Sequence, residues 1–192
     1  MSLSNIPRAN VYDLRSLKKL PPFKYFFDTN VLKFIFVPIP FKITEYQKTY
    51  YPKFYRQILS QKSFHFTFTQ NLLELFSVID NTEKEYLRID TIKTYRKDNL
   101  ETYIAMREGI LDEIKKTFII SPSKVEASHI DSYFKIDCPI DLNDFIYFEL
   151  ANAKETAFVT DDFEFIYLKE INVFTANAYA IDIASRFKKL IV

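Results

Sequence analysis

Glycine is nearly absent from this sequence: Gly109 is the only one among 192 residues. Loops that hold phosphate with backbone amides need several glycines, as in the P-loop and the dinucleotide-binding fingerprint. Both kinds of site are therefore excluded. Any phosphate chemistry must depend on side chains or on bound metal ions.

The usual ligands of zinc are also scarce. The sequence contains one cysteine, Cys138, and two histidines, His65 and His129, which are scattered along the chain. A zinc site built from nitrogen and sulfur ligands needs such residues in clusters, so we do not expect one. A single cysteine cannot form an internal disulfide, which indicates a reducing compartment.

The chain has neither an excess of one charge nor a long apolar run. Its formal net charge of +1 creates no overall basic field, so only a local patch could attract nucleic acid. Residues 25–41, the most apolar stretch, are interrupted by polar residues and prolines and should not cross a bilayer. Residues 1–15 lack the hydrophobic core of a signal peptide. These features predict a soluble cytoplasmic protein.

Short apolar segments alternate with helical patterns along the chain, which is typical of an α/β protein with a parallel sheet and helices on both faces. We predict a single domain over residues 1–192. Within it, residues 1–23 should be an extended N-terminal lead-in, and residues 38–63 an insertion with a basic, aromatic helix. Five strands are predicted, at residues 25–27, 64–68, 117–121, 156–160 and 172–175.

Acidic residues follow several of these strands. Asp28 comes directly after the first strand, Glu74 lies early in the helix after the second, and Asp161 and Asp162 follow the fourth. Asp144 lies in the first turn of a later helix. Strands of a parallel sheet lead into helices at one edge, so these acids could converge in one cleft. Clustered carboxylates repel one another, and Mg²⁺ or Mn²⁺, which prefer oxygen ligands, would relieve that repulsion.

Each acid also has a purely structural interpretation. Asp28 could be a helix N-cap. Asp144 is favoured in a first helical turn by the helix dipole, and the two acids after the fourth strand could form a turn. Glu74 is the hardest to explain in this way, because it interrupts the apolar residues of its helix. Their joint occurrence at strand ends favours a site.

Two motifs carry a resemblance to a known family. The segments Phe27-Asp-Thr-Asn-Val31 and Val159-Thr-Asp-Asp-Phe-Glu-Phe165, with acids between them, resemble the PIN-domain nucleases, which include the VapC-type toxins of bacterial toxin–antitoxin pairs. The resemblance extends over about residues 24–175. It implies a PIN-like, Rossmann-like five-stranded sheet of order 3-2-1-4-5. It also implies metal-dependent hydrolysis of single-stranded RNA, with an antitoxin protein and a second copy of the chain as candidate partners.

The resemblance also assigns roles to individual residues. Asp161 stands where the family usually has Asn or Arg, so the choice between it and its neighbour as fourth acid stays open, and Asp161 is a further candidate metal ligand. One or two Mg²⁺ or Mn²⁺ ions would bind the scissile phosphate and activate a water molecule. The catalytic, metal-binding acids are Asp28, Glu74, Asp144 and Asp162. In supporting roles, Asn30 and Thr160 match polar residues that orient ligands or water, and Glu164 falls where the family often has another acid.

The predicted helix in residues 42–62 is basic and rich in tyrosine. Its Lys48, Lys53 and Arg56, interleaved with tyrosines, could bind single-stranded RNA by charge and stacking. The alternatives are a solvated amphipathic helix and a surface that docks a partner protein.

Two other functions compete with the nuclease. The chain could be a PIN-fold module that binds nucleic acid or protein with weak or no cleavage. It could also be a metal-dependent phosphatase, although Asp28-Thr29-Asn30 lacks the second aspartate that aspartyl-phosphate enzymes place two residues after the nucleophile.

Overall fold

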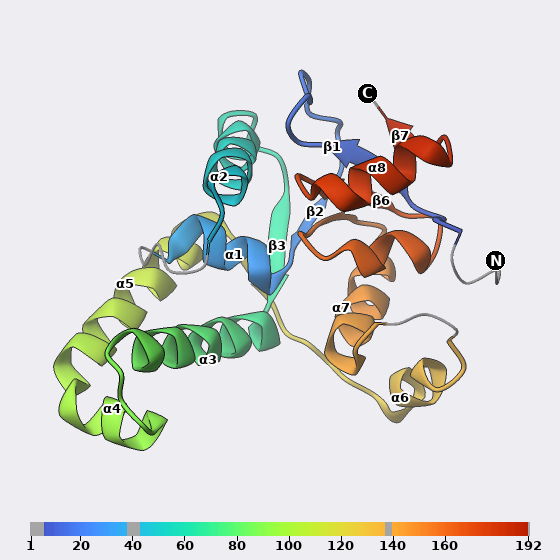
Figure 1. Ribbon diagram of the computed structural model, residues 1–192. Coiled ribbons are helices and arrows are strands. Elements are labelled where there is room, and N and C mark those ends of the chain that lie inside the picture. The colour runs from blue at the N-terminus through green and yellow to red at the C-terminus, as the bar shows by residue number, and fades with distance from the viewer. Residues whose placement is uncertain (1–5, 38–42, 137–139, 192) are drawn as a thin grey trace.

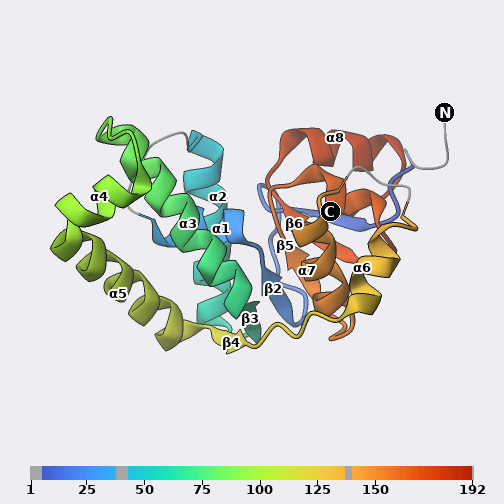
Figure 2. The same ribbon diagram turned by 90° about the horizontal axis from the view of Figure 1, so that it is seen from below.

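The computed structural model describes residues 6–37, 43–136 and 140–191, so Cys138 lies outside the described residues. A parallel sheet of seven strands forms the centre, with helices on both faces (Figures 1 and 2). The strands are β1 (Asn10–Asp13), β2 (Tyr25–Phe27), β3 (His65–Phe68), β4 (Ile119–Ser121), β5 (Ala157–Val159), β6 (Asn172–Thr175) and β7 (Leu190–Ile191). The helices are α1 (Thr29–Phe36), α2 (Glu45–Ser60), α3 (Thr69–Tyr86), α4 (Ile92–Asp98), α5 (Leu100–Thr117), α6 (Ala127–Tyr133), α7 (Leu142–Asn152), the 3-10 helix η2 (Phe163–Tyr167) and α8 (Ala178–Arg186).

The strand order is β4-β3-β2-β5-β6-β1-β7. The five predicted strands correspond to β2 through β6, and they are neighbours in the predicted order. The predicted number of five strands is wrong, because β1 and β7 continue the sheet beyond β6.

Residues 1–23 are therefore more than an extended lead-in. Within them β1 pairs in parallel with β6, and β7 pairs with the other side of β1. The side chains of β1 alternate in burial, as expected of a strand: Val11 and Asp13 are buried, whereas Asn10 and Tyr12 are half-buried. The Tyr12 ring also stacks on Phe174 of β6, with 4.4 Å between the ring centroids.

The side-chain alternation of β2 explains how both faces of the sheet are covered. Phe26 packs on one face, in a hydrophobic cluster with α7 and α8. Tyr25 and Phe27 point to the other face, where they pack with α1, α2, α3 and α5. Successive side chains of a strand alternate between faces, so three consecutive aromatic residues can fill two cores. The largest fully buried side chains are all tyrosines or phenylalanines, in a chain without tryptophan.

The predicted helical region of residues 82–116 is formed by the end of α3, α4 and α5, which extend away from the sheet (Figure 1). A buried ion cluster holds this arm together: Asp80 of α3 pairs with Arg96 of α4 and Arg107 of α5. No helix among the described residues is both long and apolar enough to span a membrane.

Candidate functional site

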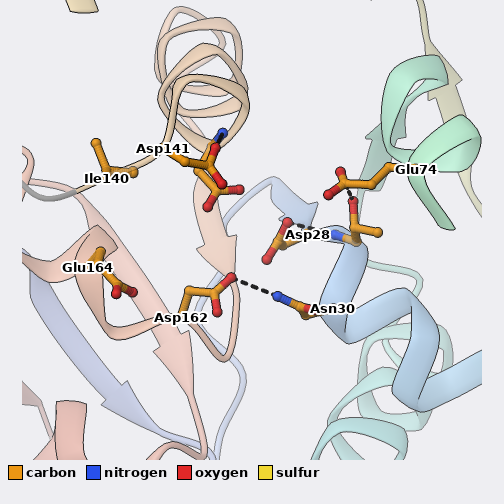
Figure 3. Close-up of a pocket in the computed structure, with 9 residues that line it drawn as sticks. Asp28, Asn30, Glu74, Ile140, Asp141, Asp162 and Glu164 are labelled. Atoms are coloured by element: carbon orange, nitrogen blue, oxygen red, sulfur yellow. Dashed lines mark hydrogen bonds between the residues drawn. The ribbon is translucent and has the colours of Figure 1, made fainter. Parts of the chain in front are cut away.

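A cavity of about 350 Å³ opens at the edge of the sheet where β2, β3 and β5 end (Figure 3). The four acids predicted to act together all line it, and they come from four separate parts of the chain. The described lining residues are Asp28, Thr29, Asn30, Glu74, Ile140, Asp141, Asp144, Asp162 and Glu164.

Asp28 is the most deeply buried of these acids, with 2% of its surface exposed. It caps α1, because its Oδ1 accepts a hydrogen bond from the backbone N–H of Thr29 at 2.7 Å. Its Oδ2 accepts from the hydroxyl of Thr160 at 3.0 Å. Burial raises the pKa of Asp28 well above its ordinary value, and repulsion from Asp162 and Asp144 raises it further, while the two hydrogen bonds partly offset the rise. Asp28 is therefore both a helix cap and a cavity acid.

Asp162 faces Asp28 from the segment that follows β5. The Nδ2 group of Asn30 donates to its Oδ2 at 2.7 Å, and its backbone N–H donates to Thr160 Oγ1 at 3.1 Å. Burial raises the pKa of Asp162, and nearby Asp161 adds to the rise. Asn30 and Thr160, which were predicted to support the site, thus both hold Asp162 in place.

Glu74 reaches the cavity from the second turn of α3. Two hydroxyl groups donate to its Oε2: Thr29 Oγ1 at 2.8 Å and Tyr147 OH at 2.9 Å. The Nδ2 group of Asn71, also on α3, donates in turn to Thr29 Oγ1 at 3.0 Å. Both hydroxyl contacts fall on one carboxylate oxygen, so they fix Glu74 by that oxygen alone.

Sequence reasoning did not identify Thr29 or Tyr147 as part of the site. Thr29 lies inside the Asp-Thr-Asn motif, which was the available signal. Tyr147 lies three residues after Asp144 and so shares a face of α7 with it. That spacing could have indicated Tyr147, but its partner Glu74 is 73 residues away in the sequence.

Asp144 lies in the first turn of α7, as predicted. Asp141 caps that helix and accepts from the backbone N–H of Asp144 at 2.9 Å. Burial, followed by repulsion from Asp141 and other cavity acids, raises the pKa of Asp144 to about 8. Glu164, in the first turn of η2, also has a raised pKa because of burial. Asp141, which sequence reasoning did not identify as a site residue, also lies in the cavity lining.

Asp161 is not among the lining residues of this cavity. Its carboxylate accepts hydrogen bonds from three side chains of α2: Tyr46, Gln47 and Tyr51. Asp161 lies in a bend after β5, and its side chain and that of Asp162 face different surroundings. Of the two acids that the sequence left as alternatives, the structure places Asp162 in the cavity.

The electrostatic character of the cavity follows from its six carboxylates. No lysine or arginine is present among the described lining residues. The oxygen-only donor set fits a hard divalent cation. As the side chains stand, however, no three Asp, Glu, His or Cys residues of the described chain are placed to hold one metal ion.

The basic residues of α2 behave only partly as predicted. Lys48, Lys53 and Arg56 are exposed, as a binding patch requires. Tyr51 and Tyr55 are instead buried in the core, with 0% and 7% of their surface exposed. The expected interleaving of basic groups with stacking aromatics is therefore wrong for these two tyrosines.

Comparisons with known proteins identify no family. No family model matches the sequence, and no curated protein matches it. Among solved structures, the crystal structure of PAE2754 from Pyrobaculum aerophilum is similar, with a TM-score of 0.49 at 11% sequence identity. The match covers 85% of this chain and 91% of that chain.

Proposed function

We propose that this protein is a PIN-type endoribonuclease that hydrolyses phosphodiester bonds of single-stranded RNA with Mg²⁺ or Mn²⁺. The main support is the convergence of Asp28, Glu74, Asp144 and Asp162 on one cavity. These acids were selected from the sequence alone, and they come from four separate parts of the chain between positions 28 and 162. Raised pKa values of buried acids in a cleft are also typical of functional sites.

In this proposal the four acids bind the cation, and the neutral donors around them keep their carboxylates aimed at the cavity. A bound divalent cation would polarise the scissile phosphate and lower the pKa of an attacking water. Asp28 and Asp144 would release protons as the cation enters, because their carboxyl groups hold protons at unusually high pH. Binding of one cation by three or more of these acids would require their carboxylates to move closer together than in this structure.

The biological setting belongs to the same proposal. By its resemblance to VapC-type toxins, the nuclease would be the toxin of a toxin–antitoxin pair, held by an antitoxin protein and able to pair as a homodimer. These partners are supported only by the two sequence motifs.

A second candidate function is a module of the same fold that binds nucleic acid or protein with weak or no cleavage. The specific observation in its favour is that no three potential ligands among the described residues are placed to hold a metal ion. Against it, a module without catalysis has no use for six carboxylates facing one cavity without a described basic partner.

Cleavage of labelled single-stranded RNA by the purified protein tests the proposal. We expect cutting with Mn²⁺ or Mg²⁺, none with EDTA, and none by Asp28→Asn with either ion. RNA that binds and stays intact would favour the binding module. Cutting that persists in EDTA would contradict the metal-dependent mechanism.

The exposed basic residues of α2 give a separate prediction about RNA binding. The triple variant Lys48→Ala, Lys53→Ala, Arg56→Ala should weaken RNA affinity most at low salt. Its salt dependence should also be shallower, by about 0.7 in the log–log slope for each lost phosphate contact. Unchanged affinity and slope would show that these residues form only a solvated helix face.

A further inference from the structure

A buried hydroxyl group on α2 lies against the segment that leads to Asp162. The OH of Tyr51 lies 2.6 Å from Asp161 Oδ1 and 3.1 Å from the carbonyl oxygen of Thr160. The backbone N–H of Ala176 donates to the same hydroxyl at 3.1 Å. Tyr51 therefore connects α2 to residues just beyond β5 and just beyond β6.

The Asp161 side chain is fully engaged with α2. Besides Tyr51, the Nε2 group of Gln47 donates to Asp161 Oδ2 at 2.6 Å, and the OH of Tyr46 donates to it at 3.1 Å. Asn177 also donates, through its Nδ2 group, to the backbone oxygen of Asp161 at 2.7 Å. Of these groups, only the Tyr51 hydroxyl also contacts the backbone of the preceding residue.

That preceding residue connects the network to the cavity. The hydroxyl of Thr160 donates to Asp28 Oδ2 at 3.0 Å and accepts from the backbone N–H of Asp162 at 3.1 Å. A displacement of the backbone at Thr160 and Asp161 would therefore move the contacts of both Asp28 and Asp162. Tyr46, Gln47, Tyr51 and Asp161 are not among the described residues that line the cavity.

We infer that Tyr51 is a positioning residue, which acts through Asp161 and the Thr160 backbone to keep Asp162 facing the cavity. Asp161 serves in this arrangement as the anchor of α2 and not as a metal ligand. The inference deepens the proposed function and rests on it for its effect on metal affinity. Its effect on the backbone does not depend on any bound ion.

Tyr51→Phe removes the hydroxyl and keeps the ring that fills the core. Tyr55→Phe is a matched control, because Tyr55 is also a buried tyrosine of α2 and its hydroxyl donates to Thr117 Oγ1 at the same distance of 2.6 Å. Tyr55→Phe loses one hydrogen bond and should lower Tm by about 2–4 °C. Tyr51→Phe loses the hydroxyl contacts with Asp161, the Thr160 carbonyl oxygen, Thr175 and the Ala176 N–H, so it should lower Tm by more. Only Tyr51→Phe should weaken Mn²⁺ affinity, by about tenfold, as expected when a residue that positions a metal ligand is lost.

Amide hydrogen exchange of the metal-free protein supplies the readout that needs no cation. In Tyr51→Phe the amides of Asp162 and Ala176 should exchange about tenfold faster than in the wild type. The Ala176 N–H loses its hydrogen-bond acceptor, and the backbone that precedes Asp162 loses its contact with the Tyr51 hydroxyl. In Tyr55→Phe both rates should be unchanged. If the Asp162 amide exchanges at the same rate in Tyr51→Phe and in the wild type, the inference is overturned, whatever the Mn²⁺ affinities of the two proteins.

Two substitutions of Asp161 separate an anchor from a ligand. Asp161→Asn keeps an oxygen that can accept from Tyr51, whereas Asp161→Ala keeps none. We expect Asp161→Ala to lose about tenfold in Mn²⁺ affinity and Asp161→Asn to lose clearly less. Equal losses would overturn the anchor role. A wild-type protein that binds no Mn²⁺ would contradict the proposed function, and the exchange rates alone would then decide the role of Tyr51.

Discussion

Two buried aspartates in this chain have their charge balanced in different ways. Asp80 of α3, which is 1% exposed, receives hydrogen bonds from the guanidinium groups of Arg107 and Arg96 on its two carboxylate oxygens. Asp28, which is 2% exposed, receives hydrogen bonds from the neutral groups of Thr29 and Thr160. Asp80 is neutralised within the fold, whereas Asp28 lies among other acids.

The difference has an energetic meaning. An ionised carboxylate that is buried without a counter-charge costs several kcal/mol, so it either holds a proton or binds a cation from solution. The arm of α3, α4 and α5 avoids this cost with two arginines. The cavity has no such arginines among its described lining residues, so the cost of its buried acids remains. A cluster of acids that makes the fold less stable is more readily explained by function than by folding.

The largest expected effect comes from neutralising the cavity acid. Asp28→Asn should reduce metal-dependent RNA cleavage by about a thousandfold, because a lost metal ligand removes several kcal/mol of transition-state stabilisation. It should not lower Tm at pH 8, since asparagine can still cap α1 and has no charge to bury. Thermal melts and initial cleavage rates check both parts. A large loss of stability would mean that Asp28 is a structural residue like Asp80.

In the arm of α3, α4 and α5 we expect the opposite pattern, a loss of stability without a loss of cleavage. Arg107→Met should lower the free energy of unfolding by about 3–5 kcal/mol, because it leaves Asp80 with only the half-exposed Arg96 as a partner. Cleavage measured well below Tm should stay near the wild-type rate. Denaturant unfolding gives the free energy.

Arg96→Met is the control for this prediction. Half of the Arg96 side chain is exposed, so its loss should cost only about 1 kcal/mol. Similar small losses in both variants would show that the ion cluster does not stabilise the arm.

The two regions should also differ in their response to pH. The pKa values of Asp28, Asp144, Asp162 and Glu164 are raised, that of Asp144 to about 8, so the folded protein holds protons that the unfolded chain releases near pH 4. The stability of the metal-free protein should therefore fall as pH rises from about 4 to about 8. Thermal melts in EDTA across this range measure the fall.

Two comparisons assign the pH effect to the cavity. Asp144→Asn should make the fall with pH shallower, because it removes one of the groups that loses a proton. Saturating Mn²⁺ should raise Tm most at pH 8, since it binds the folded state and replaces the missing protons. A Tm that rises from pH 5 to pH 8 in EDTA would contradict the raised pKa values.

The smallest effect should come from a neutral donor of the site. Tyr147→Phe removes one of the two hydroxyl groups that fix Glu74 Oε2. We expect a loss of about 1 kcal/mol in stability and about tenfold in Mn²⁺ affinity, because Thr29 still holds the same oxygen. Calorimetric titration measures the affinity. An unchanged affinity would indicate that Glu74 does not take part in cation binding.

The sequence predicted the strands and acids whose signals are local. β2, β3 and β5 are apolar segments that end next to polar residues, and their parallel arrangement brings Asp28 and Asp162 to one edge. β1 was missed because Asn10–Asp13 has only two buried side chains and follows a polar terminus. β7 has only two residues, which is too short for any periodicity.

The remaining parts of the site depend on contacts between distant segments. The sequence could not distinguish Asp161 from Asp162, because the choice is made by donors on α2 that are more than 100 residues away. Tyr147 was missed for the same reason, since only folding brings it to Glu74. Two of the α2 tyrosines that suggested RNA stacking, Tyr51 and Tyr55, are core residues, because the helix has a buried face.

Calorimetric titration of Mn²⁺ into the metal-free protein at pH 7 tests the central claim most directly. The same titration in two buffers with different ionisation enthalpies also counts the protons released. We predict saturable binding with net release of protons from the cavity acids, and weak or no binding by Asp28→Asn. Absence of binding, or binding that is the same in Asp28→Asn and releases no protons, would contradict the assignment of this cavity as a metal centre.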